Sequence, residues 1–268
     1  MKNSKIGWTE HTWNPWWGCV EVSPACNFCY ARTLAHRFGR ARWGKDTPRW
    51  FPSEAQWREP LRWHVAAGAA KQRHNVFCAS MGDIFENRRD LNEARGRTFA
   101  LAETCSNLDW LFLTKRPQEI MRLIPAEWAR CGCPQNIWLL TTVESEEYLW
   151  RADALLKVPA LSGVYGISNE PALGSIRQGL ARRLLHNDEG RRINWVITGG
   201  ESGAHARDFD IDEARQLRDL CAKAEVPFFF KQAGKRPVSL EPFPVLRDKA
   251  GADHDEWPED LRVQEYPK

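Results

Sequence analysis

The chain lacks several features that would take it out of the ordinary globular classes. Its 268 residues contain no apolar run of eighteen, so the sequence predicts no transmembrane helix and no membrane partner. The opening residues, 1–6, run into polar and aromatic residues without the apolar core of a secretion signal. The sequence shows no internal repeat and no linker that would divide it. We therefore expect a cytoplasmic protein of the globular class.

Cysteine is plentiful, and its pattern is informative. Eight cysteines in a chain without a secretion signal favour reduced thiols over a disulfide framework. Three of them, Cys19, Cys26 and Cys29, are separated by six and then two residues. Three thiolates can hold three irons of a [4Fe-4S] cluster and leave the fourth iron open to a small ligand. The pattern thus predicts a reactive iron–sulfur cluster, with the ring of Tyr30 beside it.

Two other interpretations of the same cysteines stay open. With His11 or His36 as a fourth ligand, the three thiols could form a closed structural zinc site. A zinc ribbon normally has a second cysteine pair, and the close pair Cys131 and Cys133 has only one residue between its members. The three thiols could also be unligated core residues. Soft thiolate ligands suit both centres, and we favour the cluster because this second pair fits a zinc ribbon poorly.

The net charge of +3 hides an uneven distribution along the chain. Residues 31–75 hold ten Lys and Arg against three Asp and Glu, and they include four tryptophans. Residues 240–268 hold four basic residues against eight acidic ones. Basic side chains interleaved with large rings suit nucleic acid, through phosphate neutralisation and base stacking. The same composition could equally cover a Trp-rich core or bind a protein partner.

Short apolar runs alternate with helical patterns along most of the chain. The expected strands lie at 16–19, 76–80, 110–114, 137–142, 164–168, 195–198 and 227–231. The expected helices lie at 89–105, 116–129, 146–156 and 211–224. This alternation predicts an α/β fold, a partial or complete (β/α) barrel of six to eight parallel strands. We expect the barrel to span 1–234, with a basic insertion at about 31–75 and an irregular acidic extension at 235–268.

Polar residues follow the expected strands one after another. In parallel α/β folds the carboxyl ends of the strands point to one face, where ligands bind. The sequence therefore predicts one rim that gathers the three cysteines with charged residues and a Gly-rich turn. These residues are Asp83, Lys115, Arg116, Glu144, Glu170, the turn 199–203, Lys231 and Gln232.

Several motifs of the chain resemble known families. The run Trp13-Asn14-Pro15, Gly18-Cys19, Val22-Ser23-Pro24, Cys26 and Cys29-Tyr30 resembles a phage and prophage "three-Cys-motif" family of unknown function. The blocks 113–117, 199–203 and 226–232 are similar to the same family. More broadly, an open three-Cys motif at the first strand of a (β/α) barrel resembles the radical SAM superfamily.

The resemblance implies a chemistry and a set of roles. A [4Fe-4S] cluster on the three cysteines would bind S-adenosylmethionine (SAM) at its open iron. An electron donor would reduce the cluster, and the reduced cluster would cleave SAM. The resulting 5′-deoxyadenosyl radical would abstract hydrogen from a substrate, with nucleic acid bound through 31–75 as the leading candidate. The cofactor contacts would be Tyr30, Ser80, Asp83, Thr141, Glu144, Gly199 and Gly200. The catalytic residues would be Glu170, Glu201 and Lys231.

Two rival functions fit the same sequence. One is a metal-dependent hydrolase with its metal on Asp83, Glu144, Glu170 and Glu201, and a structural zinc on the cysteines. The other is a nucleic-acid-binding module with a structural metal and no catalysis. Apart from His205, no histidine follows an expected strand, which favours the iron–sulfur enzyme over the hydrolase.

Overall fold

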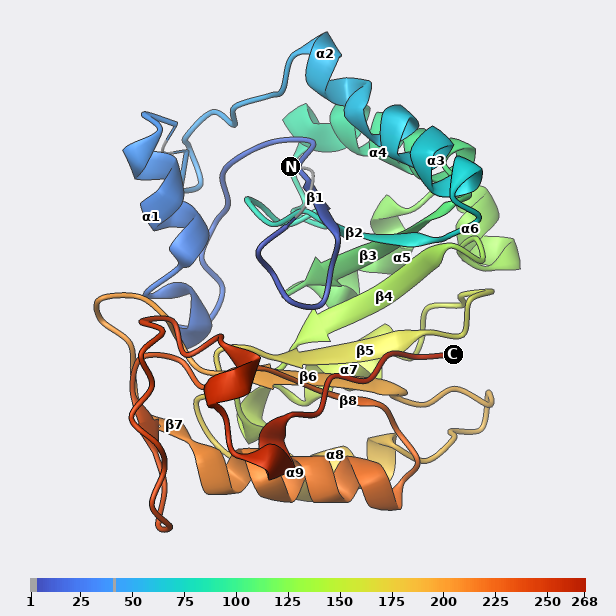
Figure 1. Cartoon of the computed structure of the whole chain (residues 1–268). Coiled ribbons are helices and arrows are strands. Elements are labelled where there is room, and N and C mark those ends of the chain that lie inside the picture. Colours follow the sequence, from blue (N-terminus) through green and yellow to red (C-terminus); the bar gives the residue numbers. More distant parts are fainter. Residues whose placement is uncertain (1–3, 41) are drawn as a thin grey trace. The chain divides into compact units, whose positions relative to one another are not determined.

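The computed structural model describes residues 4–40 and 42–268, and the chain forms two compact units (Figure 1). The first unit comprises Met1–Leu140 and Lys157–Gly163. The second comprises Thr141–Leu156 and Val164–Lys268, so the acidic extension expected at 235–268 belongs to it.

Seven strands make up the main sheet, in the order β1-β2-β3-β4-β5-β6-β8. Their bounds are β1 (His11–Trp13), β2 (His74–Cys78), β3 (Leu108–Thr114), β4 (Ile137–Thr142), β5 (Tyr165–Asn169), β6 (Trp195–Gly199) and β8 (Phe228–Gln232). Helices separate most of the successive strands, and the side chains of the strands are almost all buried. This α/β arrangement confirms the predicted fold class, a partial (β/α) barrel.

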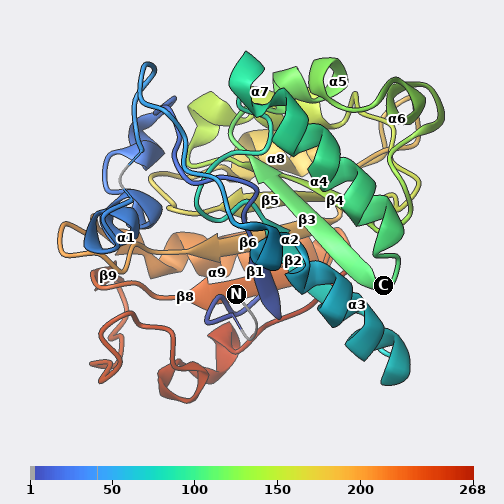
Figure 2. The same ribbon diagram turned by 90° about the horizontal axis from the view of Figure 1, so that it is seen from above.

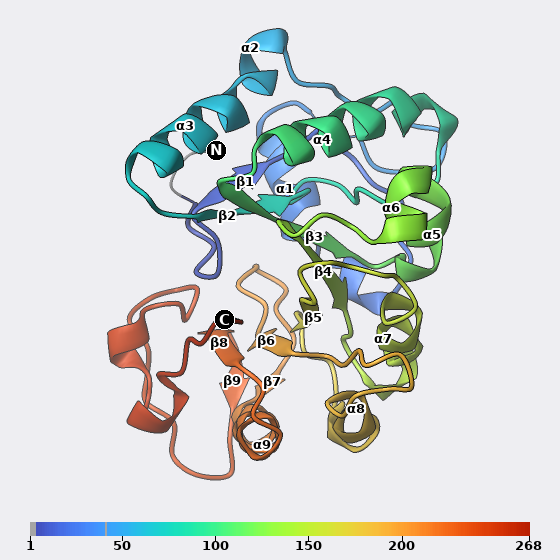
Figure 3. The same ribbon diagram turned by 90° about the vertical axis from the view of Figure 1, so that its right-hand side faces the viewer.

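The first unit is built on the parallel strands β1, β2 and β3. Helices α3 (Glu59–Ala69) and α4 (Asn92–Thr104) lie on the same side of these strands, with α4 running alongside β3 (Figures 2 and 3). Tryptophan rings fill the core, because Trp13 meets Trp57 and Trp110 edge to face at 4.6 and 6.0 Å. The remaining helices of this unit are α1 (Tyr30–Arg37), α2 (Glu54–Trp57), α5 (Ile120–Leu123) and α6 (Ala126–Cys131).

The second unit is built on the parallel strands β5, β6 and β8. Helices α8 (Arg177–Arg183) and α9 (Ile211–Lys223) lie on one side of these strands (Figure 1), and α7 (Trp150–Leu155) belongs to the same unit. Asp210 caps α9 as expected, since its carboxylate accepts from the backbone of Asp212 and Glu213. A short parallel pair, β7 (Phe209–Asp210) and β9 (Pro237–Val238), joins the start of α9 to the extension.

The extension packs against the second unit rather than trailing from it. Trp257 and Leu261 are buried, and Phe230 of β8 donates a backbone hydrogen bond of 2.8 Å to Val263. The indole of Trp195 donates to the carbonyl of Glu265 at 2.9 Å. The acidic charge of this segment is therefore carried on a chain that completes the core.

Two expected elements are wrong. The first strand lies at His11–Trp13 rather than at 16–19, and Trp17 instead makes an isolated antiparallel bridge with Trp50. The helix expected at 116–129 is interrupted, because Pro125 starts a new helix after α5 ends. Within the described residues, none of the helices is both long and apolar enough to cross a membrane.

Candidate functional site

The loop that follows β2 is organised by Asp83, which the sequence predicts at the site. The buried carboxylate of Asp83 accepts from the Thr114 hydroxyl at 2.7 Å and from the Lys115 backbone at 3.1 Å. It also forms an ion pair of 2.8 Å with Arg116. β2 and β3 are parallel neighbours, so their carboxyl ends lie together and bring these groups within reach.

Arg116 connects this pair to the cysteine loop. One of its terminal nitrogens donates to the carbonyl of Val20 at 2.6 Å, and the other lies 3.7 Å from the sulfur of Cys19. Burial alone would lower the pKa of Arg116, but the charges of Asp83 and Cys19 raise it above the ordinary value. Burial raises the pKa of the Cys19 thiol to about 12, against the opposing effect of Arg116.

A second set of contacts fixes the other end of the cysteine loop. The hydroxyl of Tyr30, at the start of α1, donates to the carbonyl of Ser80 at 2.9 Å. Asn14 donates to the Ser80 hydroxyl at 3.1 Å and accepts from the Met81 backbone at 2.6 Å. Cys29 packs against the small buried cluster that contains Met81. The structure thus places Tyr30 against Ser80 and Cys29 against the cluster of Met81.

Gly18 allows the cysteine loop to approach its neighbours closely. Its φ is +117°, and a Cβ at this position would collide with the carbonyl of Arg42 and lie 2.8 Å from the side chain of Arg49. Gly82 faces it, because a Cβ there would lie 3.1 Å from the Gly18 carbonyl. The absence of side chains at Gly18 and Gly82 therefore lets the backbone just before Cys19 pack closely against the loop after β2.

The three thiols have the chemistry of a cluster site but are not gathered into one. Cys19, Cys26 and Cys29 are half-buried and free of disulfides. Within residues 4–40 and 42–268, no group of three or more His, Cys, Asp or Glu side chains is placed to hold a metal ion. The segment between Cys19 and Cys29 is mostly exposed, so few packed contacts oppose a movement that would bring the sulfurs together.

The histidines considered as a fourth zinc ligand are placed differently. His11 is buried on β1, stacks on Trp63 with ring centroids 4.4 Å apart, and lies 3.3 Å from the ring nitrogen of His74. His36 lies in the last turn of α1. His11 therefore serves the core of the first unit.

Each carboxylate that the sequence places at a strand end is paired with a basic side chain. Asp83 pairs with Arg116 in the first unit, as described above. In the second unit the pairs are Glu144 with Arg151 at 2.7 Å, Glu170 with Lys231 at 2.6 Å and Glu201 with Arg207 at 2.5 Å. The sequence analysis did not identify Arg151 or Arg207 as partners. The signal that could have found them is weak: an Arg seven residues after Glu144 and six residues after Glu201.

The Glu144–Arg151 pair is the most deeply buried of these. Both side chains are 1% exposed. In the part of the chain that the structure describes, Glu144 Oε1 and Arg151 Nε have no hydrogen-bond partner. Thr141, also expected near a cofactor, is fully buried on β4. Such an unsatisfied buried oxygen is costly, and it marks Glu144 as a group able to accept one more hydrogen bond.

The Gly-rich turn after β6 has a packing role. A Cβ on Gly199 would lie 3.1 Å from the Gln232 carbonyl, and one on Gly200 would lie 2.7 Å from the Ala233 carbonyl. Glu201 turns back to Arg207, accepting from both its side chain and its backbone. Burial raises the pKa of Glu201, but these bonds outweigh it and hold the pKa below its usual value.

The basic insertion is partly structural. The side chain of Arg49 is fully buried, pairs with Glu86 at 2.5 Å and donates to three backbone carbonyls. Trp57 and Trp63 are buried as well. Arg49 therefore cannot take part in the phosphate contacts expected of residues 31–75, because its guanidinium is bound inside the protein. Arg40 lies over the rings of Trp50 and Trp17, at 4.2 and 5.2 Å.

These features define an α/β protein whose cysteine loop is anchored at the carboxyl ends of β2 and β3. The family described as "Protein of unknown function (DUF5131)" matches residues 3–258, so the chain belongs to that family. No curated protein and no solved structure matches the chain. The match bears out the expected membership of a family of unknown function, and the radical SAM and phage resemblance stays a prediction.

Proposed function

We propose that this protein is a radical-SAM-type iron–sulfur enzyme that acts on nucleic acid. The observation that carries the proposal is the attachment of the Cys19 loop to Asp83 through Arg116. This attachment sets a thiol beside the carboxyl ends of parallel strands, which is where α/β folds bind ligands.

The chain's own residues would share the work of holding the cofactors. Cys19, Cys26 and Cys29 would ligate a [4Fe-4S] cluster and leave one iron open. Bound SAM would supply a reactive radical once the cluster is reduced. Arg116 would keep Cys19 and the loop carbonyl of Val20 in place, and its positive charge beside the sulfur would favour a ligating thiolate. Tyr30 and Ser80 would border the same space.

A nucleic-acid substrate is supported by the surface around the cysteine loop. Phe28, Tyr30, Phe38 and Phe51 are 43–59% exposed, so a base could reach part of each ring. Residues 31–51 carry six Lys and Arg against one Asp, and Arg49 is the one that is buried. Exposed rings among basic side chains suit a single strand, whose bases can stack while its phosphates are neutralised.

The pairing of the strand-end carboxylates disfavours the hydrolase alternative. A catalytic metal needs several carboxylates or histidines directed at one point. Here Asp83, Glu144, Glu170 and Glu201 each bind an Arg or Lys. A metal that used these carboxylates would have to displace their ion pairs. Two of the pairs, Asp83–Arg116 and Glu144–Arg151, are nearly fully buried.

The proposal is tested by metal analysis of protein prepared without oxygen. We expect about four irons and about four sulfides per chain, as in one [4Fe-4S] centre. Separate changes of Cys19, Cys26 and Cys29 to Ala should abolish the charge-transfer absorption. The matched controls are Cys105→Ala and Cys221→Ala, which alter buried thiols away from the loop and should keep it. Stoichiometric zinc in anaerobic protein would contradict the cluster.

A second measurement separates the cluster from its use. Protein loaded with iron and reduced by dithionite should convert SAM into 5′-deoxyadenosine and methionine. The Cys19→Ala variant should give none. A full cluster without this product would retain the iron–sulfur assignment and overturn the radical SAM assignment.

A further inference from the structure

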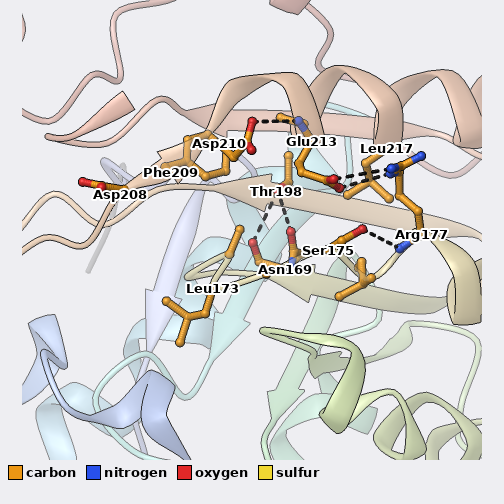
Figure 4. A pocket seen from close by; sticks show the side chains of 14 residues that line it. Asn169, Leu173, Ser175, Arg177, Thr198, Asp208, Phe209, Asp210, Glu213 and Leu217 are labelled. Atoms are coloured by element: carbon orange, nitrogen blue, oxygen red, sulfur yellow. Dashed lines mark hydrogen bonds and ion pairs between the residues drawn. The ribbon is translucent and has the colours of Figure 1, made fainter. Parts of the chain in front are cut away.

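A pocket of about 280 Å³ opens in the second unit, apart from the paired carboxylates described above (Figure 4). Its deep wall is formed by Asn169 at the end of β5 and Thr198 on β6, which are only 3% and 1% exposed. Their side chains are joined by a hydrogen bond of 2.9 Å. The opposite wall is the first turns of α9, through Ala214 and Leu217.

This pocket lies on the helix side of the sheet. Successive side chains of a strand point to opposite faces. Asn169 faces α9, whereas its neighbours Ser168 and Glu170 are hydrogen-bonded to each other, at 3.2 Å, and Glu170 binds Lys231. The pocket is therefore separated by the sheet from the face that carries Glu170 and Lys231.

The walls of the pocket combine apolar surface with carboxylates at the mouth. Leu173, Ile176, Phe209 and Leu217 supply the apolar surface. Asp208, Asp210 and Glu213 face one basic side chain among the lining residues, that of Arg177. The volume is at the lower end of small-molecule sites, which suits a ligand much smaller than a dinucleotide.

The charges at the mouth are only partly compensated. Arg177 bonds Glu213 at 3.1 Å, and Arg236 bonds Asp208 at 2.7 Å on the surface. Among the contacts that the structure describes, Asp210 accepts only from backbone groups, those of Asp212 and Glu213. Burial raises the pKa of Glu213, but bonds from Arg177 and Ser175 lower it overall and keep this carboxylate ionised.

We infer that this pocket binds a small organic cation, with an aliphatic chain against Leu173 and Leu217 and an ammonium group at Asp210 and Glu213. An ammonium offers three donors and one charge, which match carboxylates that retain free acceptor positions. The excess of carboxylates disfavours phosphates and other anions. The pocket is independent of the proposed iron–sulfur chemistry, since all its residues belong to the second unit.

The test uses full-length protein prepared without iron and 1,4-diaminobutane as the probe. We expect saturable binding by calorimetry and a rise in melting temperature, both weakened by salt. The matched control ligand is 1,4-butanediol, which has the same chain length without the charge and should give neither. Equal effects of the two compounds, or no binding of the diamine, would overturn the inference.

Variants decide whether the pocket is the place of binding. Glu213→Gln removes one charge but can still accept from Arg177, and it should weaken diamine binding about tenfold. Ala214→Leu fills the pocket and should abolish binding, while an unchanged melting temperature without ligand would show that the fold is kept. Asp219→Asn, on an exposed part of the same helix, should bind as the original protein does. Unchanged binding in both pocket variants would place the diamine elsewhere and refute the site.

Discussion

Arg49 and Glu86 form an ion pair of 2.5 Å whose side chains are 0% and 4% exposed. Glu86 also lies in the loop after β2, and its backbone carbonyl accepts from the buried Arg95. The pair therefore ties residues 42–49 of the basic insertion to the loop that carries Asp83. Arg49, which the sequence does not distinguish from a surface cation, therefore has a structural role beside the site.

Removal of the Arg49–Glu86 ion pair should destabilise the protein. Arg49→Ala leaves the buried carboxylate of Glu86 without its ion-pair partner and removes one donor from three carbonyls, and we expect a loss of about 3–5 kcal/mol in the free energy of unfolding. Urea denaturation measures it. Arg122→Ala is the control, because its pair with Glu119 is long, at 3.8 Å, and Arg122 is 69% exposed, so about 0–1 kcal/mol should be lost. A loss below 1 kcal/mol for Arg49→Ala would contradict a structural role.

Gly18 offers a test of the loop geometry that leaves every thiol in place. Gly18→Ala forces a side chain into a positive-φ position against the Arg42 carbonyl. We expect a much lower iron content after anaerobic reconstitution, because Cys19 is displaced from Arg116. Gly39→Ala is the matched control, since its φ is also positive, at +64°, but a Cβ there meets nothing within 4 Å. Equal iron content in the two variants would show that the close packing of Gly18 is not needed for iron binding.

Nucleic-acid binding should depend on the half-buried Arg40 and the exposed Arg42, and not on the buried Arg49. Changing Arg40 and Arg42 to Ala should make the slope of log affinity against log salt concentration less steep for single-stranded DNA, by about 0.7 per lost phosphate contact. Phe38→Ala should weaken binding by about 1–3 kcal/mol through lost stacking. Fluorescence anisotropy of a labelled oligonucleotide gives both values. Leu185→Ala, a similarly exposed apolar residue in the second unit, is the control.

The Glu201–Arg207 pair predicts a stability change at acidic pH. The folded-state pKa of Glu201 lies below its usual 4.5, so its contribution is present above about pH 4.5 and is lost as the pH falls through the folded value. The stability difference between the original protein and Glu201→Gln should therefore shrink between pH 5 and pH 3. Urea titrations at several pH values check it. Glu241→Gln, at an exposed position, should show no such convergence, and a constant difference for Glu201→Gln would refute the linkage.

The strands were predictable because burial on both faces leaves a continuous apolar signature. The run 137–142 coincides with β4, and 76–80 overlaps β2 with a shift of two residues. β1 was missed because His11 and Thr12 are polar residues that are buried inside the protein, whereas Trp16 and Trp17 gave the stronger apolar pattern five residues later. The pattern of apolar residues along a sequence indicates which residues are buried, and it indicates which strands pair only indirectly.

The site was predictable in its acids but not in their partners. The strand-end rule identified Asp83 and Glu144 from their positions alone. Their ion pairs, and the Arg49–Glu86 pair across 37 residues of sequence, depend on three-dimensional packing that no local spacing encodes. The close spacing of the cysteines was visible in the sequence, whereas the contacts of Arg116 with Cys19 and Val20 were not.

Nine of the fourteen tryptophans are buried, including Trp57 and Trp63 of the basic insertion. Intrinsic fluorescence of this protein is therefore dominated by indoles that respond to unfolding. A bound oligonucleotide could quench only the few partly exposed rings near the cysteine loop, which are Trp17, Trp43 and Trp50. The emission spectrum will act as a sensitive gauge of denaturation and a poor gauge of binding, which is why the label belongs on the nucleic acid.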